Sequence, residues 1–164
     1  MLRVSKWFAL ILLICSPDLA WADAVAKYGV MIPKECESLS ATKAVFVSKQ
    51  SSLGGPFIKQ LEVGGWDDTD GRGRKSSGMA SASAGLNVNA GYIFAQALVG
   101  PAIISTPDKL LGGRFQFNND FALGLRDPKT GASIGAAYKH ISSAGLEHPN
   151  EGRDFILFRV GIPW

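Results

Sequence analysis

The sequence predicts an all-β protein: an eight-stranded antiparallel transmembrane β-barrel of the outer-membrane type. Three observations predict it. Of the 164 residues, 46% are hydrophobic and only 19% are charged, whereas roughly 25% are charged in an ordinary soluble domain. Apolar and polar residues alternate with a period of two along most of the chain, as in strands with two different faces. Short turns and longer polar links also alternate between the expected strands, as they do at the two ends of a membrane barrel.

The composition also excludes several other classes of protein. No run of about 18 apolar residues follows the N-terminal segment, which excludes a helical protein with several spans. Apolar residues are too abundant and the net charge of +3 too small for a disordered chain. The same small net charge gives little reason to expect a nucleic-acid partner.

Residues 1–22 are expected to be a secretory signal peptide. Arg3 and Lys6 supply a basic start, residues 7–14 an apolar core, and Ala20-Trp21-Ala22 a cleavage site of the small-x-small type. We therefore expect cleavage after Ala22 and export across the inner membrane.

Two other interpretations of this N-terminal segment are weaker. A membrane anchor is disfavoured because Pro17 and Asp18 interrupt the apolar stretch, and a lipoprotein site at Cys15 lacks the small residue that should precede it. Residues 23–164 then form a single barrel domain, in which Cys36 is the one remaining cysteine and has no partner for an intrachain disulfide.

The alternation places the strands, and it is clearest from Arg114 to Arg126. The odd positions there are apolar with the single exception of Asn119, whereas the even positions are polar, small or charged. Similar alternation runs from Gly78 to Ala90 and along the last ten residues. The eight expected strands lie near 24–31, 43–49, 56–66, 78–89, 92–104, 113–126, 131–142 and 154–163.

The connections decide between a membrane barrel and a soluble one, because a soluble sandwich also alternates. Asn89-Ala90-Gly91 and residues 127–131 are typical of tight turns, whereas the links at 67–77, 105–112 and 143–153 are longer and more polar. This asymmetry, together with strands long enough to cross a membrane, favours an outer-membrane barrel over a periplasmic lipocalin-like barrel. The terminal Trp164 is similar to the C-terminal assembly signal of such barrels.

The candidate catalytic side chains lie on the outer wall of the expected barrel, near the last long loop. His140 and Ser142 are two residues apart, so they project from the same face of a strand, and Lys139 projects from the other. A lysine belongs in the polar lumen, so His140 and Ser142 point toward lipid, where polar groups are costly without a purpose. Asp154 begins the next strand in phase with the outward residue Ile156.

A hydroxyl, an imidazole and a carboxylate can therefore meet on the outside of the barrel. In a hydrolase of this kind the imidazole accepts the serine proton, and the carboxylate fixes its tautomer and stabilises the imidazolium. The alternative from spacing alone is an interfacial polar cluster that faces lipid headgroups, because His-x-Ser is a motif of low information.

A longer segment carries a family resemblance. The sequence His140-Ile-Ser-Ser-Ala-Gly-Leu-Glu-His-Pro-Asn-Glu-Gly152, followed by Asp154, resembles the pattern of the lipid A 3-O-deacylase (PagL) family, which is His-x-Ser-Asn-Ala-Gly, then Pro-Asn-x-Gly and an acidic residue. The similarity extends weakly back to about Gly112. Before that point the chain matches only in barrel pattern and length.

The resemblance implies an outer-membrane serine esterase that removes the ester-linked 3-hydroxyacyl chain from the 3 position of lipid A in lipopolysaccharide. It implies Ser142 as nucleophile, His140 as general base and Asp154 as the orienting acid. It also implies that Asn150 donates to the oxyanion together with backbone N–H groups near Ser143 to Gly145. No cofactor or metal is implied, and the expected partners are lipopolysaccharide and outer-membrane lipid.

Two positions depart from the family pattern. The acidic residue is usually glutamate, and the shorter Asp154 must approach the imidazole more closely. Ser143 replaces the asparagine that follows the nucleophile. Two other functions stay open on the sequence, namely a non-enzymatic small outer-membrane barrel of the structural or adhesin type and a periplasmic lipid-binding barrel, and so does a homodimer.

Overall fold

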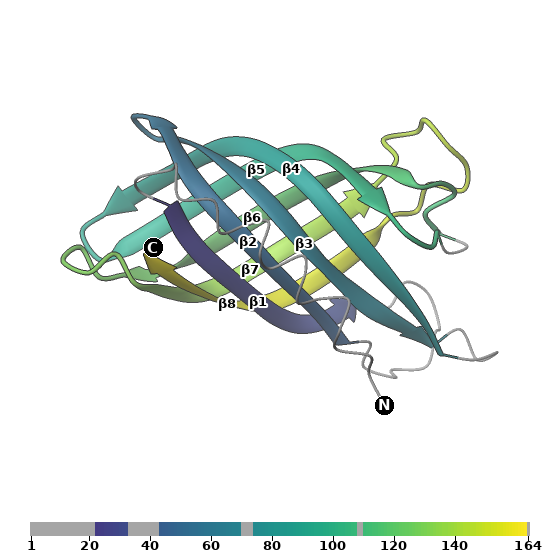
Figure 1. Cartoon of the computed structure of the whole chain (residues 1–164), viewed down its shortest axis with the longest axis horizontal. Helices are drawn as coiled ribbons and strands as arrows, with labels where there is room; N and C mark the ends of the chain where they lie inside the picture. Colours follow the sequence, from purple (N-terminus) through teal and green to yellow (C-terminus); the bar gives the residue numbers. More distant parts are fainter. Residues whose placement is uncertain (1–21, 33–42, 70–73, 108–109, 164) are drawn as a thin grey trace.

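The structure, a computed structural model, describes residues 22–32, 43–69, 74–107 and 110–163. Eight antiparallel strands, each paired with the next, form a closed barrel in which β1 also pairs with β8 (Figure 1). The strands are β1 (Ala22–Ile32), β2 (Lys43–Gly54), β3 (Phe57–Thr69), β4 (Arg74–Ala90), β5 (Ile93–Ile104), β6 (Phe115–Arg126), β7 (Ser133–Ser142) and β8 (Arg153–Pro163). The predicted fold class and the number of strands are confirmed. The expected signal peptide, Cys36 and Trp164 lie outside the described residues, apart from Ala22 at the start of β1.

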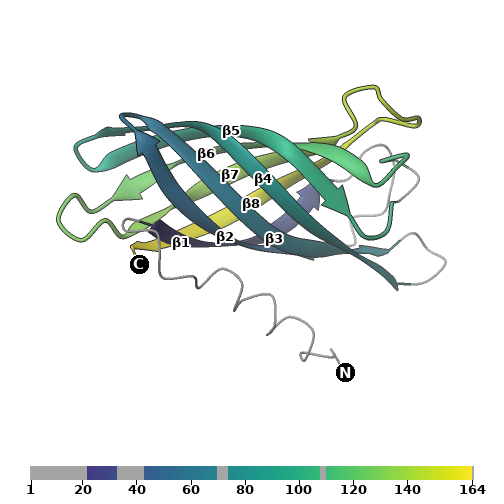
Figure 2. The same ribbon diagram turned by 45° about the horizontal axis from the view of Figure 1, so that its top comes forward.

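The two ends of the barrel differ in their connections. β8 ends beside the short turns, and the β7–β8 connection projects from the opposite end, at the right of Figures 1 and 2. We call these the turn end and the loop end. Figure 2 shows the strands inclined to the long axis of the barrel, which is the tilt that closure of a sheet requires.

Some expected strand bounds were wrong: β2 continues past the expected residue 49 to Gly54, and β3 and β4 are also longer than expected. Residues 67–77 were predicted to be a long loop, but β3 and β4 stay paired as far as Thr69 and Arg74. Asp67 pairs with Ser76, whose hydroxyl donates to the aspartate Oδ1 at 2.8 Å. The prediction ended these strands where apolar alternation ends, but backbone pairing does not require an apolar face, and the ladder continues in polar sequence.

Large apolar side chains cover the outside of the barrel. Every strand contributes exposed members, and on β6, β7 and β8 they are Phe115, Phe121, Leu123, Leu125, Ile134, Tyr138, Ile156, Phe158, Val160 and Ile162. The opposite rows are buried, as the alternation predicted. Among the described residues there is no helix long and apolar enough to span a membrane.

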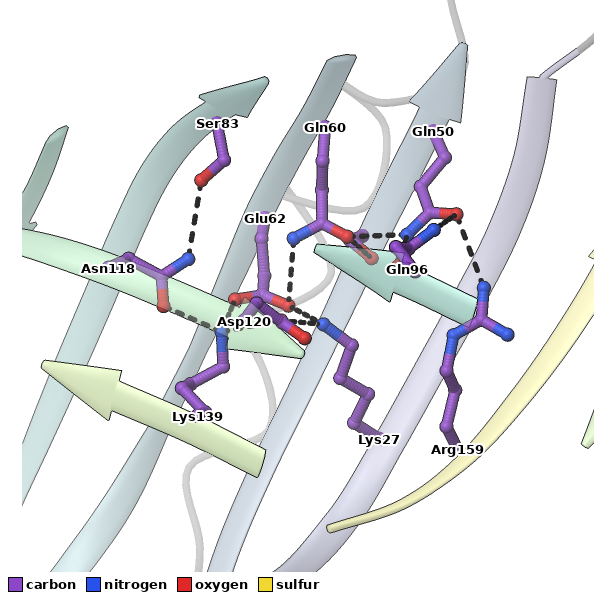
Figure 3. Close-up of polar contacts among 11 residues, drawn as sticks. Lys27, Gln50, Gln60, Glu62, Ser83, Gln96, Asn118, Asp120, Lys139 and Arg159 are labelled. Carbon is purple, nitrogen blue, oxygen red and sulfur yellow. Dashed lines mark hydrogen bonds and ion pairs between the residues drawn. The ribbon is translucent and has the colours of Figure 1, made fainter. Parts of the chain in front are cut away.

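The middle of the lumen is filled by a buried network of charges. Figure 3 shows Lys27 and Lys139 converging on Glu62 and Asp120, and all four side chains have no exposed area (Figure 3). Lys139 Nζ lies 2.6 Å from Glu62 Oε1 and 2.9 Å from Asp120 Oδ2, and Lys27 Nζ lies 2.8 Å from Glu62 Oε2 and also binds Asp120. The two positive and two negative charges balance, which is what burial of ions requires.

Further side chains fill the lumen on both sides of this network. Toward the turn end, Gln50 exchanges amide hydrogen bonds with Gln96 and accepts one from Arg159 (Figure 3). Toward the loop end lies a buried apolar cluster in which the ring of Phe155 packs against Phe46 and Trp66, with centroids 5.7 and 5.3 Å away. The interior is thus occupied by protein, and functional groups have to be sought on the outer wall or in the loops.

Candidate active site

The β7–β8 hairpin brings an imidazole and a carboxylate together at the loop end. His140 pairs directly with Asp154 across the hairpin, so both side chains project from the same face. His140 Nδ1 lies 2.7 Å from Asp154 Oδ1, and the two side chains are 30% and 15% exposed. The aspartate therefore reaches the imidazole despite its short side chain. With a hydrogen on Nδ1 directed at the carboxylate, Nε2 is left to accept a proton.

Ser142 lies on the same outward row, at the end of β7. It pairs with Phe117 of β6, and its side chain is half-buried. Its hydroxyl makes no hydrogen bond within the described part of the chain, His140 included. Hydrogen bonds between a nucleophile and its base are often long or misaligned without substrate and tighten when it binds. The arrangement places a hydroxyl one outward position from the imidazole.

Tyr138 is part of this cluster, and the sequence reasoning gave it no role. Its hydroxyl donates to Asp154 Oδ1 at 2.5 Å, the same oxygen that binds His140. The tyrosine ring stacks on Phe121 of β6, with centroids 6.5 Å apart and planes at 28°. The available signal was its position two residues before His140 in the outward row, but a hydroxyl on an aromatic ring there is also typical of a membrane interface.

The loop that follows Ser142 is closed by its own hydrogen bonds. The Ser143 N–H donates to Asn150 Oδ1 at 2.7 Å, and the buried Ser143 hydroxyl donates to the Glu147 carbonyl at 2.9 Å. Leu146 N–H donates to the Ser143 carbonyl across Ala144 and Gly145, whose φ angles of 52° and 84° belong to a type I′ turn.

These bonds change the set of expected oxyanion donors. The Ser143 N–H is occupied by Asn150, so it is not directed at an incoming ester in this structure. The Asn150 side chain accepts this bond through its oxygen, so its amide nitrogen is the end left to act as a donor. The remaining backbone donors of the expected set are those of the turn at Ala144 and Gly145.

Gly152 lies directly against the imidazole. Its φ is +72°, and a Cβ at this position would be 2.7 Å from His140 Cε1 and 3.2 Å from Nε2. The β5–β6 connection supports this segment, because the Glu151 N–H donates to the Leu110 carbonyl at 3.0 Å. Gln116 holds that connection in turn by donating to the carbonyl of Leu111 at 2.8 Å.

No group of three or more histidine, cysteine, aspartate or glutamate side chains within the described ranges is arranged to hold a metal ion. The chemistry that the arrangement supports is nucleophilic and acid–base chemistry by the side chains themselves. The cluster faces the surroundings of the barrel, next to an apolar belt, so it is accessible to an ester held in a membrane.

Comparisons with known proteins concern the family and the fold. A family model described as "Lipid A 3-O-deacylase (PagL)" matches residues 40–163. Among solved structures, the crystal structure of the outer membrane enzyme PagL covers 87% of this chain and 99% of its own, with 20% identity and a TM-score of 0.69. The attachment invasion locus protein Ail of Yersinia pestis covers 88% and 97%, with 8% identity and a TM-score of 0.57.

The two solved structures are too distant in sequence to show more than the eight-stranded fold. No curated protein matches the chain significantly. The family match is of a different kind, because it spans most of the chain and includes the whole β7–β8 hairpin with His140, Ser142 and Asp154. The chain therefore belongs to the lipid A 3-O-deacylase (PagL) family of outer-membrane hydrolases.

Proposed function

We propose that Ser142, His140 and Asp154 form the catalytic triad with which this protein removes the 3-O-linked 3-hydroxyacyl chain of lipid A. The observation that carries the proposal is the 2.7 Å contact between His140 and Asp154 on the outer wall, next to the outward hydroxyl of Ser142. A paired imidazole and carboxylate on a lipid-facing surface is costly unless it serves a purpose.

The reaction proceeds in two steps. Ser142 Oγ attacks the ester carbonyl carbon while His140 Nε2 accepts the hydroxyl proton, and Asp154 stabilises the imidazolium that forms. The bond to the sugar oxygen then breaks, His140 protonates that oxygen, and the chain is left as an acyl ester on Ser142. Water activated by the same imidazole cleaves this ester and releases a free 3-hydroxy fatty acid.

The oxyanion of each tetrahedral intermediate is stabilised by the loop after β7. The Asn150 amide nitrogen is one donor, and the N–H groups of Ala144 and Gly145 are the others. Because Asn150 Oδ1 is held by the Ser143 N–H at 2.7 Å, the amide plane is fixed before substrate binds. Fixed donors are what make such a hole effective, since they need no reorganisation during the reaction.

Two substitutions test the triad. Purified protein is incubated with lipopolysaccharide, and lipid A and free fatty acids are analysed by mass spectrometry. We expect the wild type to release a 3-hydroxy fatty acid, and Ser142→Ala and His140→Asn to abolish the release. His148→Asn is the matched control, because His148 is the other histidine and is exposed in the same loop. Undiminished release by both triad variants would contradict the proposal, and so would absence of release by the wild type, which would favour a non-enzymatic barrel.

A third substitution tests the oxyanion donor. Asn150→Asp keeps an oxygen to accept from the Ser143 N–H but loses the amide donor. We expect a fall in kcat of roughly 10²- to 10³-fold, as for other oxyanion-hole donors, with unchanged heat-modifiable migration on gels. Full activity of this variant would exclude Asn150 from the oxyanion hole.

The same proposal includes the route to the outer membrane. Residues 1–22 are removed as a signal peptide, and residues 23–164 form the mature barrel. N-terminal sequencing of protein recovered from outer membranes is expected to begin at Asp23. Recovery of protein that still begins at Met1 would contradict cleavage.

A further inference from the structure

Asn119 is the one polar member of the outward row of β6 and has no role in the triad. The other outward residues of that strand are Phe115, Phe117, Phe121, Leu123 and Leu125. The Asn119 side chain is half-buried, and within the described residues its amide makes no hydrogen bond. An amide that faces hydrocarbon without a partner is costly, so this position calls for a partner that the protein itself does not supply.

The register places this amide beside the catalytic imidazole. Asn119 pairs directly with His140 across β6 and β7, and Asp154 pairs with His140 from β8. The β8 side of the imidazole is occupied by the Asp154 carboxylate, which also binds the Tyr138 hydroxyl. The β6 side carries only the Asn119 amide, so this is the polar group that a chain bound at Ser142 meets on that side.

An acyl chain of the substrate class carries a group that fits this amide. In a 3-hydroxyacyl ester, a hydroxyl stands on the second carbon beyond the carbonyl that Ser142 attacks. A hydroxyl both donates and accepts, and so does a primary amide. Directly paired residues on one face of a sheet have Cβ atoms about 5 Å apart, so the amide is within reach of a hydroxyl this close to the reacting carbon.

We propose that Asn119 is a specificity-determining residue that binds the 3-hydroxyl of the acyl chain being removed, and so selects 3-hydroxyacyl esters over esters without that hydroxyl. The proposal rests on the proposed function of Ser142 and His140. It gives Asn119, the polar residue in the apolar outward row of β6, a role in substrate recognition. It also explains why this polar residue lies opposite His140 and not further along the strand.

The test compares two lipid A substrates that differ only in the 3-hydroxyl of the ester-linked chain, in wild-type protein and in Asn119→Leu. Leucine has nearly the shape of asparagine and matches its apolar neighbours. We expect the wild type to prefer the hydroxylated ester in kcat/KM by roughly fivefold or more, the value of one hydrogen bond. We expect Asn119→Leu to lose this preference by slowing the hydroxylated substrate alone. Asn119→Ala is expected to do the same, and Leu125→Ala, in the same row toward the turn end, is the control that keeps it.

Each outcome decides the proposal. A preference that survives in both Asn119 variants overturns it, and so does an equal slowing of both substrates, which would mean that the amide binds the sugar or a headgroup instead. Heat-modifiable migration verifies that each variant is folded. If wild-type protein cleaves neither substrate, the proposed function itself fails. If wild-type protein cleaves both substrates equally well, the proposed function stands and the role of Asn119 is overturned.

Discussion

Replacement of Gly152 by alanine tests whether the position of the His140 ring controls activity. Gly152 is the last residue before β8, and its φ of +72° is one that an L-residue rarely adopts. The added methyl would lie 2.7 Å from His140 Cε1 and 2.9 Å from the Ile141 carbonyl oxygen. Because that oxygen belongs to the backbone of β7, the imidazole is the group that has to move.

The size of the movement sets the expected loss. Ordinary contact begins at 3.4 Å, so the ring has to retreat by about 0.7 Å from the new methyl. A misplacement of about 1 Å costs on the order of 10²-fold in rate, and we therefore expect Gly152→Ala to lose between tenfold and a hundredfold in kcat. The left-handed backbone adds a loss of roughly 1–2 kcal/mol in unfolding free energy.

The assay separates these two effects. Gly91→Ala is a matched control, because Gly91 also has a positive φ, of +61°, but nothing lies within 4 Å of its added Cβ, and it stands at the turn end. We expect both variants to lose similar stability in urea unfolding, and only Gly152→Ala to lose fatty-acid release. Equal activity of the two variants would refute the argument that Gly152 sets the ring position.

Three further predictions follow from contacts described above. Tyr138→Phe removes the hydrogen bond from the tyrosine hydroxyl to Asp154 Oδ1, so kcat should fall severalfold while KM and the unfolding midpoint change little, as steady-state kinetics and thermal unfolding would show. Asp120→Asn leaves the buried network with an excess positive charge, and breaking a buried pair costs about 3–5 kcal/mol, a loss measurable by urea unfolding in detergent. Hydrogen bonds from the Thr130 hydroxyl and the Lys129 N–H lower the pKa of Asp127 in a short turn. The turn is therefore stabilised at neutral pH and loses this contribution as acid protonates Asp127, so Asp127→Asn should be less stable than wild type at neutral pH and approach it in acid.

Local pattern was sufficient to predict the strands and the meeting of His140 with Asp154. Alternation assigns each residue to one face, and a slip of one residue in a hairpin would turn an apolar row inward. Alternation therefore places His140 and Asp154 on the same outward face near the loop between their strands, and the structure adds that they pair directly. The interior position of Lys139 follows from the same reasoning and is confirmed, since its side chain is fully buried.

Contacts that depend on closure of the barrel or on loop conformation could not be predicted from the sequence. Lys27 and Asp120 are 93 residues apart and meet only because β1 closes the barrel against β8. The bond between Ser143 and Asn150 depends on the path of the β7–β8 connection, for which the sequence carries no periodic signal. Tyr138 was assigned to the correct face, but its hydrogen bond to Asp154 depends on a side-chain rotamer that alternation does not determine.

In the proposed function the triad faces outward while side chains fill the lumen, so the reaction takes place on the outer surface of the barrel. Under that proposal, substrate reaches Ser142 by lateral diffusion within the leaflet, and both products are released into the same leaflet, because the buried charges of the interior leave them no route through the protein. Turnover should then follow the mole fraction of lipid A in the membrane rather than its amount per volume. Dilution of lipid A with an inert phospholipid slows the reaction even when the total quantity of lipid A is unchanged.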